Sequence, residues 1–587
     1  MNRKSLLAFI LLSLSTISMA QIKEEKLILD RKRVPEVKRI EKKKTSVPSE
    51  KNYPPEEKSN EVIDYQIQDV PVLSDFQPST IQGEDVSPKL GNQYQRNYFR
   101  LGYGNYNQFL ADGSISGNIQ DNLEVGADVH YTSNEGLKNE YAWKSGQKDT
   151  KLTGFLNHYG DLGKTNVTTN IKLHDFNWYG VNEFQPDADT DFRQTYSQFD
   201  VNAHYDFYSK NILNSVDFTS SFLKDRFNAN ESQVNFGLNL SKYEIEFGQD
   251  LKLNLDLGTG VQLVNTNFKE LTQNQSKYFN GHLTPKVTFQ KGDSYLMLGS
   301  EFSFLNGSTQ SNLLNEKQNG RFYWFPKVEV LLGVSPEIQF YGGVDGGLKM
   351  NTYESLLNEN PYLVPDLSLK PTETKYQFYV GIKGTWEDQL KYDVNAKFGK
   401  LNNMAFYKAN SLFDDELYAN RVAYDFLNTY HIAYHNGSLS EVEANLHYNP
   451  ISNLQIDGGL KFQKFNLDHQ AIVYNKPLVQ MSIGANYAML DKKLNLGAKA
   501  FFVSDRTTNV YTLQPNPLIA IPNYNISEAV EHKVGGYADI NLSAEYRIHK
   551  NFSIFALANN LVGAKYQTYN GYKVLGTQIL GGVKVRF

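Results

Sequence analysis

The stretch GTQILGGVKVRF, residues 576–587, decides the fold of this chain because its residues alternate in character. Successive side chains of a β-strand point to opposite faces. One face of this stretch comprises Ile579, Gly581, Val583, Val585 and Phe587, and the other comprises Gly582, Lys584 and Arg586. The sequence therefore predicts a strand with one face suited to lipid and one face suited to water.

The opening residues, MNRKSLLAFILLSLSTISMA, have the features of a secretory signal peptide. Arg3 and Lys4 precede an apolar run at 6–14, and small residues close the segment, so we expect cleavage after Ala20. The apolar run is too short to anchor the chain across a bilayer. The 587 residues include no cysteine, which excludes a lipoprotein and a disulfide framework. We expect an envelope protein of a Gram-negative cell.

The composition excludes a helical membrane protein, because mean hydropathy is -0.50 and no second long apolar segment occurs. Aromatic residues nevertheless make up 13% of the chain, with 38 Tyr and 35 Phe. Transmembrane barrels need aromatic girdles at both membrane interfaces and enclose a polar interior. A soluble propeller is also rich in Tyr and Gly, but this sequence shows no repeat of fixed period. The net charge of -5 gives no support for a nucleic-acid partner.

The segment 21–95 differs from the rest, because it is dense in charge and proline. Such a composition cannot support a packed core, so we expect a mostly disordered periplasmic segment. Its later part, DVPVLSDFQPSTI at 69–81, carries some apolar residues. This part lies against the barrel mouth, enters the lumen or is a solvated linker. Residues 96–587 form the predicted barrel.

From 97 onward the sequence is a succession of alternating segments, such as YADINLSAEYR at 537–547. A soluble sandwich would show the same period of two, so the connections have to decide. Tight turns alternate with longer loops, the largest near 133–149, 175–191, 305–320, 350–374, 401–426 and 505–532. About ten turns and about eleven loops predict an all-β, antiparallel outer-membrane barrel of about 22 strands, in which 427–449 is one strand or two.

Charged residues on the water-facing side of these strands are the predicted lining of the lumen. They are Arg100, Asp128, Asp539, Glu545, Arg547, Lys584 and Arg586. Their alternative role is purely structural, as charge ladders that pack a wet interior.

Three stretches resemble the barrels of TonB-dependent receptors, and together they cover the whole predicted barrel. Residues 100–133 resemble the opening strands, 552–587 resemble the closing strands, and 360–384 (NPYLVPDLSLKPTETKYQFYVGIKG) resembles a recurring NPxLxPE segment of the family. Asp366 stands where that segment usually has Glu. The sequence is most similar to members from the Bacteroidota. The resemblance implies outer-membrane lipid and the barrel-insertion machinery as partners, with Phe587 as the insertion signal.

The same family carries an N-terminal plug domain, preceded by a short TonB box. The segment 21–95 is too short and too charged for such a plug, and it contains no convincing TonB box. We therefore expect a barrel without a plug and do not predict TonB coupling. Because an open barrel of this width would be a large hole, we expect closure by inward-folded loops, by residues 60–95 or by a plugging or surface partner protein.

The sequence supports no catalytic, cofactor or metal site. Gly292-Asp293-Ser294 resembles a hydrolase motif only as a tripeptide and lies in a predicted turn. Asp187, Asp189 and Asp191 have the spacing that opens a calcium loop, but Phe192 replaces the required glycine, which favours a solvated acidic loop. We do not expect an enzyme.

Aromatic residues in two long loops are the best candidates for ligand binding. They are Phe406, Tyr407, Phe413 and Tyr418 in 401–426, and Tyr511 and Tyr524 in 505–532. Such residues suit the capture of a solute and equally suit packing between loops that cap the pore. The predicted function is solute uptake across the outer membrane; the alternative is a non-transporting scaffold in an outer-membrane complex.

Overall fold

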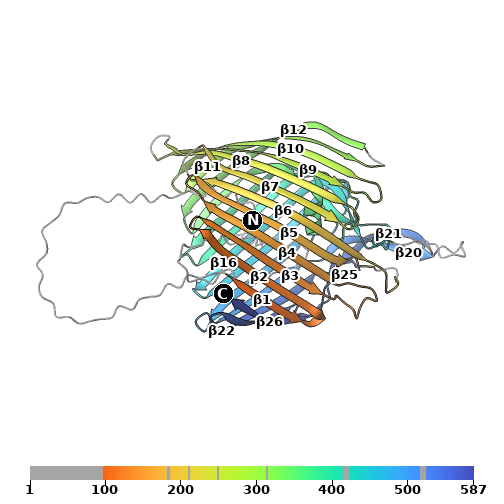
Figure 1. The fold of residues 1–587 in the computed structure, drawn as a ribbon. Helices are drawn as coiled ribbons and strands as arrows, with labels where there is room; N and C mark the ends of the chain where they lie inside the picture. Colours follow the sequence, from red (N-terminus) through yellow and green to blue (C-terminus); the bar gives the residue numbers. More distant parts are fainter. Residues whose placement is uncertain are drawn as a thin grey trace, which may run out of the picture. The chain divides into compact units, whose positions relative to one another are not determined.

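The structure is a computed structural model that describes residues 97–587, apart from 182–185, 209–211, 247–249, 313–314, 414–421 and 516–523. Twenty-two antiparallel strands form one closed sheet (Figure 1). This barrel confirms the predicted fold class and strand number. The predicted signal peptide and the segment 21–95 lie outside the described residues.

The strands of the ring follow one another in chain order. They are β1 (Tyr98–Gly104), β2 (Gln108–Gln120), β3 (Leu123–Asn134), β4 (Gln147–Tyr159), β5 (Gly163–Asn177), β6 (Arg193–Phe207), β7 (Leu213–Asp225), β8 (Asn230–Glu246), β9 (Lys252–Asn267), β10 (Gln275–Lys291), β11 (Ser294–Gln310), β12 (Asn315–Ser335), β13 (Ile338–Lys349), β14 (Thr372–Trp386), β15 (Leu390–Ala409), β16 (Tyr430–Ile451), β17 (Leu454–Leu467), β18 (Val479–Met489), β19 (Leu494–Val503), β22 (Tyr537–His549), β23 (Phe552–Asn559) and β26 (Gln578–Arg586).

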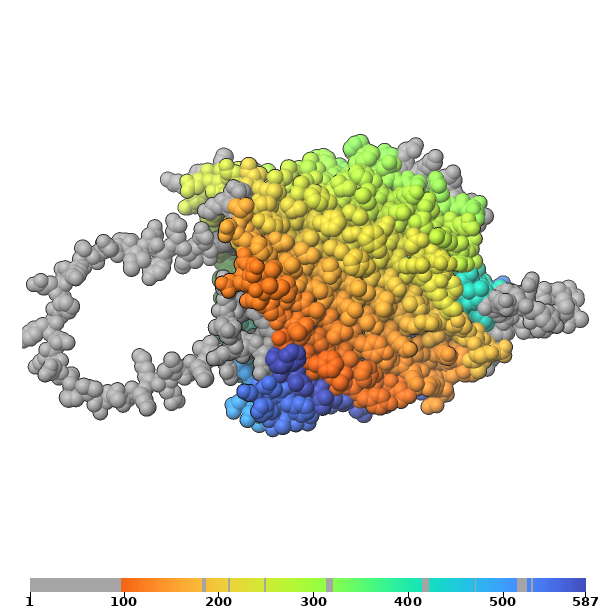
Figure 2. Space-filling view, viewed as in Figure 1, coloured from red at the N-terminus to blue at the C-terminus, as the bar shows by residue number. Residues whose placement is uncertain are grey.

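The first and last strands close the ring. β1 pairs with β26 from Tyr98 opposite Arg586 to Gly104 opposite Leu580, and its other edge pairs with β2. Figure 2 shows the dark blue end of the chain lying against the orange start of the barrel. The sheet therefore has no free edge at the point where the chain begins and ends its barrel.

The two faces of the wall differ as the alternation predicts. In β26, Val583 and Val585 are exposed on the outside, whereas Lys584 between them is only 2% exposed. β22 repeats the pattern, with Ile540 and Leu542 exposed. An apolar outer face and a polar inner face are the arrangement that a barrel surrounded by lipid requires.

The connections alternate between the two ends of the barrel. The end that carries Tyr98 and Arg586, which we call the turn end, has only short connections. All the long connections lie at the opposite loop end, together with three short ones, 105–107, 226–229 and 311–314. Gly292 and Asp293 form one of the short turns, between β10 and β11, as expected.

Two predicted loops are shorter than expected, because polar sequence continues the strands beyond the apolar band. The predicted loop 305–320 is largely strand, since β11 and β12 remain paired up to Gln310 opposite Asn315. The predicted loop 401–426 begins too early, since β15 extends to Ala409. The segment 427–449 falls mainly in the single strand β16.

The loop end carries the remaining elements. They are the helix α2 (Tyr353–Glu359), the hairpin β20 (Arg506–Pro515) and β21 (Tyr524–Val534), the short hairpin β24 (Gln567–Tyr569) and β25 (Tyr572–Lys573), and two 3-10 turns, η1 (Asn105–Asn107) and η2 (Asp468–Gln470). Figure 1 shows β20 and β21 extending away from the wall. Within the described residues, no helix has the length and apolar character needed to cross a membrane.

Candidate functional site

Buried apolar side chains gather at the loop end of the barrel, where we define the mouth cluster. Its members are Phe176, Trp178, Tyr196, Leu223, Phe227, Ala229, Phe268, Tyr353, Leu356, Leu357, Leu363, Val364, Leu367, Leu369, Tyr407, Ala409, Ala423, Tyr424, Tyr430, Tyr569 and Tyr572. They come from strands and connections between β5 and β8, from Phe268 in the connection after β9, from residues between β13 and β16, and from β24 and β25 between β23 and β26. Because these strands occupy separate sectors of the ring, their side chains meet only over the lumen. The loops therefore cover the mouth of the barrel.

Tyrosine side chains join the covering loops to one another. The ring of Tyr362 stacks on that of Tyr572, with 3.4 Å between centroids and 15° between planes. The hydroxyl of Tyr569 donates a hydrogen bond to the carbonyl of Glu359 at 3.0 Å. Asn428 donates its side-chain amide to the carbonyl of Trp178 at 2.6 Å. Each contact links segments more than a hundred residues apart, so the cover depends on several loops at once.

Helix α2 is fastened to the inner wall through its N-terminal end. A capping box formed by Thr352 and Ser355 starts the helix. The buried carboxylate of Glu231 on β8 accepts hydrogen bonds from the backbone N–H groups of Tyr353 at 2.6 Å and Glu354 at 3.0 Å. A carboxylate at this position satisfies helical donors that have no partner within the helix.

The side chain of Glu354 strengthens the same attachment. It accepts hydrogen bonds from Ser221 at 2.9 Å and Gln233 at 3.0 Å, and a third from Gln198. The donors lie on β6, β7 and β8, so one helical residue is held by three strands.

The C-terminal end of α2 is held by charge. Glu359 pairs with Lys476 at 2.8 Å and with Lys349 at 3.8 Å, and it accepts a hydrogen bond from the Tyr407 hydroxyl at 2.8 Å. Burial raises the pKa of Glu359, but the attraction of the two lysines and the hydrogen bonds outweighs it and lowers the pKa to about 2. Glu359 is therefore ionised, and it ties α2 to the β17–β18 connection that carries Lys476.

The segment that follows α2 is the one that resembles the NPxLxPE pattern. Leu363, Val364 and Leu367 of this segment are buried in the mouth cluster. Asp366, which replaces the usual Glu, accepts hydrogen bonds from the backbone and hydroxyl of Thr272 and from Asn274, each at 2.7 Å. The segment thus connects the cover to the loop between β9 and β10.

The residues predicted to line the lumen lie on β1, β3, β22 and β26, on the face opposite the exposed apolar residues. Glu545 pairs with Arg586 and, at 3.5 Å, with Lys584. Arg100 pairs with Asp112, and Asp539 accepts a hydrogen bond from the Tyr566 hydroxyl at 2.8 Å. Asp128 and Arg547 are partly exposed on β3 and β22.

A second charged group lies on the inner wall at β15–β17. Lys397 and Lys461 each pair with both Glu441 and Glu443, at distances between 2.6 and 3.3 Å. Charges in such an alternating network hold one another in place, which is a structural role for a wet interior.

The predicted loop aromatics divide into three groups. The prediction that Phe406 and Tyr407 belong to a loop was wrong. Both residues lie in strand β15, and both are buried. Phe413 forms an isolated bridge with Phe426, and Tyr511 of β20 packs against the mouth cluster. Tyr418 lies outside the described residues, and Tyr524 is the first residue of β21.

The acidic loop forms an ion pair. Asp191 of the acidic loop pairs with Arg226 at 2.6 Å, and within the described part of the chain no cluster of His, Asp and Glu has the geometry of a metal site. Sequence reasoning missed α2 and the tyrosines of β24 and β25. The run YQTYNGY at 566–572, with three Tyr between two predicted strands, was the available signal.

Comparisons with known proteins show what the fold is similar to. No protein-family model matches the sequence, and no curated protein does. The ferric-catecholate import receptor Fiu of E. coli K12 superimposes with a TM-score of 0.60 at 11% identity, covering 84% of this chain and 82% of that one. The pyoverdine outer membrane receptor FpvA of Pseudomonas aeruginosa gives 0.59 at 14%, covering 84% and 78%. The ferric preacinetobactin receptor BauA of Acinetobacter baumannii gives 0.58 at 13%, covering 84% and 79%. These likenesses establish the fold.

Proposed function

We propose that the chain is an outer-membrane barrel that passes a solute through its lumen and that the mouth cluster closes the lumen on the extracellular side. The observation that carries the proposal is the meeting of loops from separate sectors of the ring over a charged interior. A charged inner wall suits a lumen filled with water. A barrel of 22 strands encloses a wide lumen, which needs a cover if it is not to stay open. The similar structures include a ferric-catecholate import receptor and a ferric preacinetobactin receptor, which supports an uptake role.

Several finer proposals accompany this one. The loop end faces outside the cell and the turn end faces the periplasm, with Phe587 as the insertion signal. The described part of residues 97–587 consists of the barrel strands and their connections. We extend the proposal to a receptor barrel of the Bacteroidota type that works without a plug and without TonB coupling. The role is not enzymatic, and the partners are lipid, the insertion machinery and a surface or plugging protein.

Single-channel conductance in a planar bilayer tests the proposal. We expect the purified wild-type protein to be almost silent, because the mouth is covered. The double variant Tyr362→Ala, Tyr572→Ala removes the central ring stack and should show discrete openings. Tyr208→Ala, at an exposed tyrosine of the turn end, is the matched control and should stay silent.

Two results would contradict the proposal. Steady, large conductance of the wild-type protein would show that the loops do not close the lumen. Silence of a double variant that still folds as a barrel would show that the mouth cluster is not the gate.

The second candidate function is a scaffold protein that does not transport a solute. The many contacts that hold α2 to the barrel wall favour it. Glu231, Glu354 and Glu359 attach one seven-residue helix to the wall at both ends, as expected of a permanent lid. A scaffold should co-purify with stable partners, and the double variant should leave that association unchanged. Uptake that disappears in cells lacking TonB would instead identify an energised importer.

A further inference from the structure

Strands β12 and β13 separate towards the loop end. Their pairing runs from Ser335 opposite Ile338 to Val328 opposite Val344 and then stops. Beyond this point β12 stays paired with β11, and β13 stays paired with β14 as far as Lys349. A bulge in β14, where Lys375 and Tyr376 lie opposite the single residue Gly346 of β13, accompanies the separation. A bulge bends its strand and increases the local twist.

Lys327 marks the point where the two strands part. Its ammonium lies 2.5 Å from a carboxylate oxygen of Asp345 on β13 and 3.2 Å from one of Glu301 on β11. The ion pairs connect the strands where their backbone hydrogen bonds end. Above them the residue pairing between β12 and β13 ends, and we call this gap in the ladder the opening.

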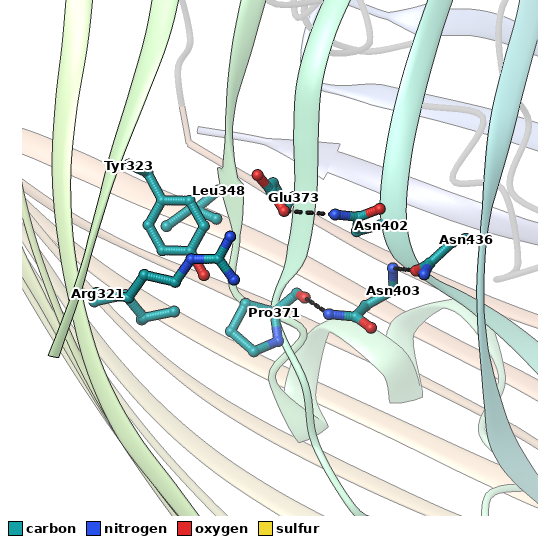
Figure 3. A pocket seen from close by; sticks show the side chains of 9 residues that line it. Arg321, Tyr323, Leu348, Pro371, Glu373, Asn402, Asn403 and Asn436 are labelled. Atoms are coloured by element: carbon teal, nitrogen blue, oxygen red, sulfur yellow. Dashed lines mark hydrogen bonds between the residues drawn. The ribbon is translucent and has the colours of Figure 1, made fainter. Parts of the chain in front are cut away.

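A cavity of about 290 Å³ lies at this opening. Arg321 and Tyr323 of β12 line one side, and Glu373, Asn402 and Asn436 of β14, β15 and β16 line the other (Figure 3). The cavity shares no residue with the mouth cluster, so it is a separate feature of the barrel.

The cavity contains a cation without an acidic partner. The Arg321 guanidinium lies 4.7 Å from the centroid of the Tyr323 ring. Among the described residues, no carboxylate oxygen lies within ion-pair distance of Arg321. The Glu373 carboxylate instead accepts a hydrogen bond from Asn402 at 2.7 Å. The Arg321 guanidinium also makes a side-chain hydrogen bond to Tyr323. Its remaining donors are available to an anion in the cavity that Arg321 lines, and a guanidinium suits phosphate oxygens.

The opposite side of the cavity is suited to hydroxyl groups. The Asn403 backbone N–H donates to the side-chain oxygen of Asn436 at 2.9 Å, which leaves the amide of Asn436 as a donor. Glu373 is an acceptor fixed in place by Asn402. Tyr323, Leu348 and Pro371 provide apolar surface between these polar groups.

We propose that this cavity binds a phosphorylated sugar. The phosphate contacts Arg321, the sugar hydroxyls contact Glu373 and Asn436, and one face of the sugar ring packs against Leu348 and Pro371. This function goes beyond passage of solute through the lumen.

A phosphorylated sugar can reach the cavity from two sources. It is either the headgroup of a glycolipid in the membrane or a soluble sugar phosphate. On the outer side of β12, Phe322 is 79% exposed and Trp324 is 62% exposed, and aromatic residues of this kind mark the membrane interface of barrels. A lipid-linked headgroup at that level has direct access to the opening. A soluble sugar phosphate would enter from the loop end.

Binding measurements on the purified full chain in detergent test the proposal. Calorimetry with glucose 1-phosphate, glucose and inorganic phosphate separates the contributions of the sugar and the phosphate to binding. Native mass spectrometry with lipid A tests whether a glycolipid binds. We expect glucose 1-phosphate or lipid A to bind, and Arg321→Gln to weaken binding by about tenfold or more, because a hydrogen bond to a charged group contributes roughly 1.5–3 kcal/mol. Arg321→Lys, which keeps the charge but loses the planar fork, should weaken it less.

The control variant is Arg193→Gln, at an exposed arginine of β6 outside the cavity, and it should bind like the wild type. Binding of lipid A alone assigns the glycolipid source, and binding of glucose 1-phosphate assigns a soluble one. Inorganic phosphate binding as tightly as the sugar phosphate would overturn the sugar site. Absence of binding by every probe, or equal affinities of wild type and a folded Arg321→Gln variant, would overturn the proposal entirely.

Discussion

Glu359 is the residue on which the lid depends most directly, because its carboxylate joins α2 to two lysines and to Tyr407. Its pKa in the folded protein is about 2, below the ordinary value of 4.5. A depressed carboxylate pKa stabilises the folded arrangement at all pH values above the ordinary pKa. That stabilisation is lost as the pH falls from about 4.5 towards about 2.

We therefore expect acid to open the lid of the wild-type barrel over this pH range. Glu359→Gln should show openings already at neutral pH, and its opening should change little between pH 4.5 and 2. Glu337→Gln, at the turn end, is the matched control and should respond to acid like the wild type. Bilayer conductance as a function of pH measures the effect, and an identical acid response of Glu359→Gln and the wild type would contradict it.

Asp366 offers a second test at a single side chain. Asp366→Ala removes three hydrogen bonds to Thr272 and Asn274 and should release the loop between β9 and β10. A protease added to the loop end should then cleave near 268–274 faster than in the wild type. Asp250→Ala, in a short turn at the opposite end, controls for general destabilisation. Equal cleavage of Asp366→Ala and the wild type would contradict this role.

At the scale of elements, glycines opposite tyrosines fix the register of β13 and β14. Gly381 lies opposite Tyr341 and Gly343 lies opposite Tyr379, so each ring occupies the space that a side chain would fill. Tyr341 also donates a hydrogen bond to Asp393 at 2.5 Å, which holds its ring in place. Cross-strand pairs of this kind specify strand register.

Substitution of one of these glycines should destabilise the barrel. A Cβ at Gly381 would lie 2.6 Å from the Tyr341 hydroxyl oxygen, so Gly381→Ala should lower the free energy of unfolding by roughly 1–3 kcal/mol. Gly484→Ala is the matched control, because the nearest atom to its Cβ would be the Ala498 carbonyl at 3.8 Å, and its effect should stay within about 0.5 kcal/mol. Urea titration in detergent compares the two, and equal stabilities would contradict the argument.

The strands could be predicted because the alternation of residues that indicates a strand lies within one short stretch of sequence. The lid could not be predicted because it depends on contacts between distant segments. Alternation within YADINLSAEYR already indicates a strand with one wet face, and short turns such as Gly292-Asp293 indicate where strands end. Phe406 and Tyr407 carry the same aromatic signal in a strand as in a loop, so their burial in β15 was not evident. Contacts such as Trp178 with Pro361 join segments far apart in the chain, and no local pattern encodes them.

For the whole molecule, the position of the lid predicts the outcome of a truncation. Because loops within residues 97–587 cover the lumen, deletion of 21–95 should leave bilayer conductance as low as in the intact mature chain. The double variant Tyr362→Ala, Tyr572→Ala serves as the positive control for an open barrel. A large conductance of the truncated chain would show that the deleted segment takes part in closure.

The pairing of β1 with β26 also determines when the chain is able to fold. These partners are separated by almost the whole barrel sequence, and each strand of the ring needs a neighbour on both sides. The ring is therefore incomplete until its last nine residues are available, and a contact of such long sequence separation forms slowly. Until then both terminal edges are open to pairing with other chains, so the unfinished barrel is prone to aggregation. A chain that lost β26 would keep two unpaired edges and would be recognisable to proteolysis as unfinished.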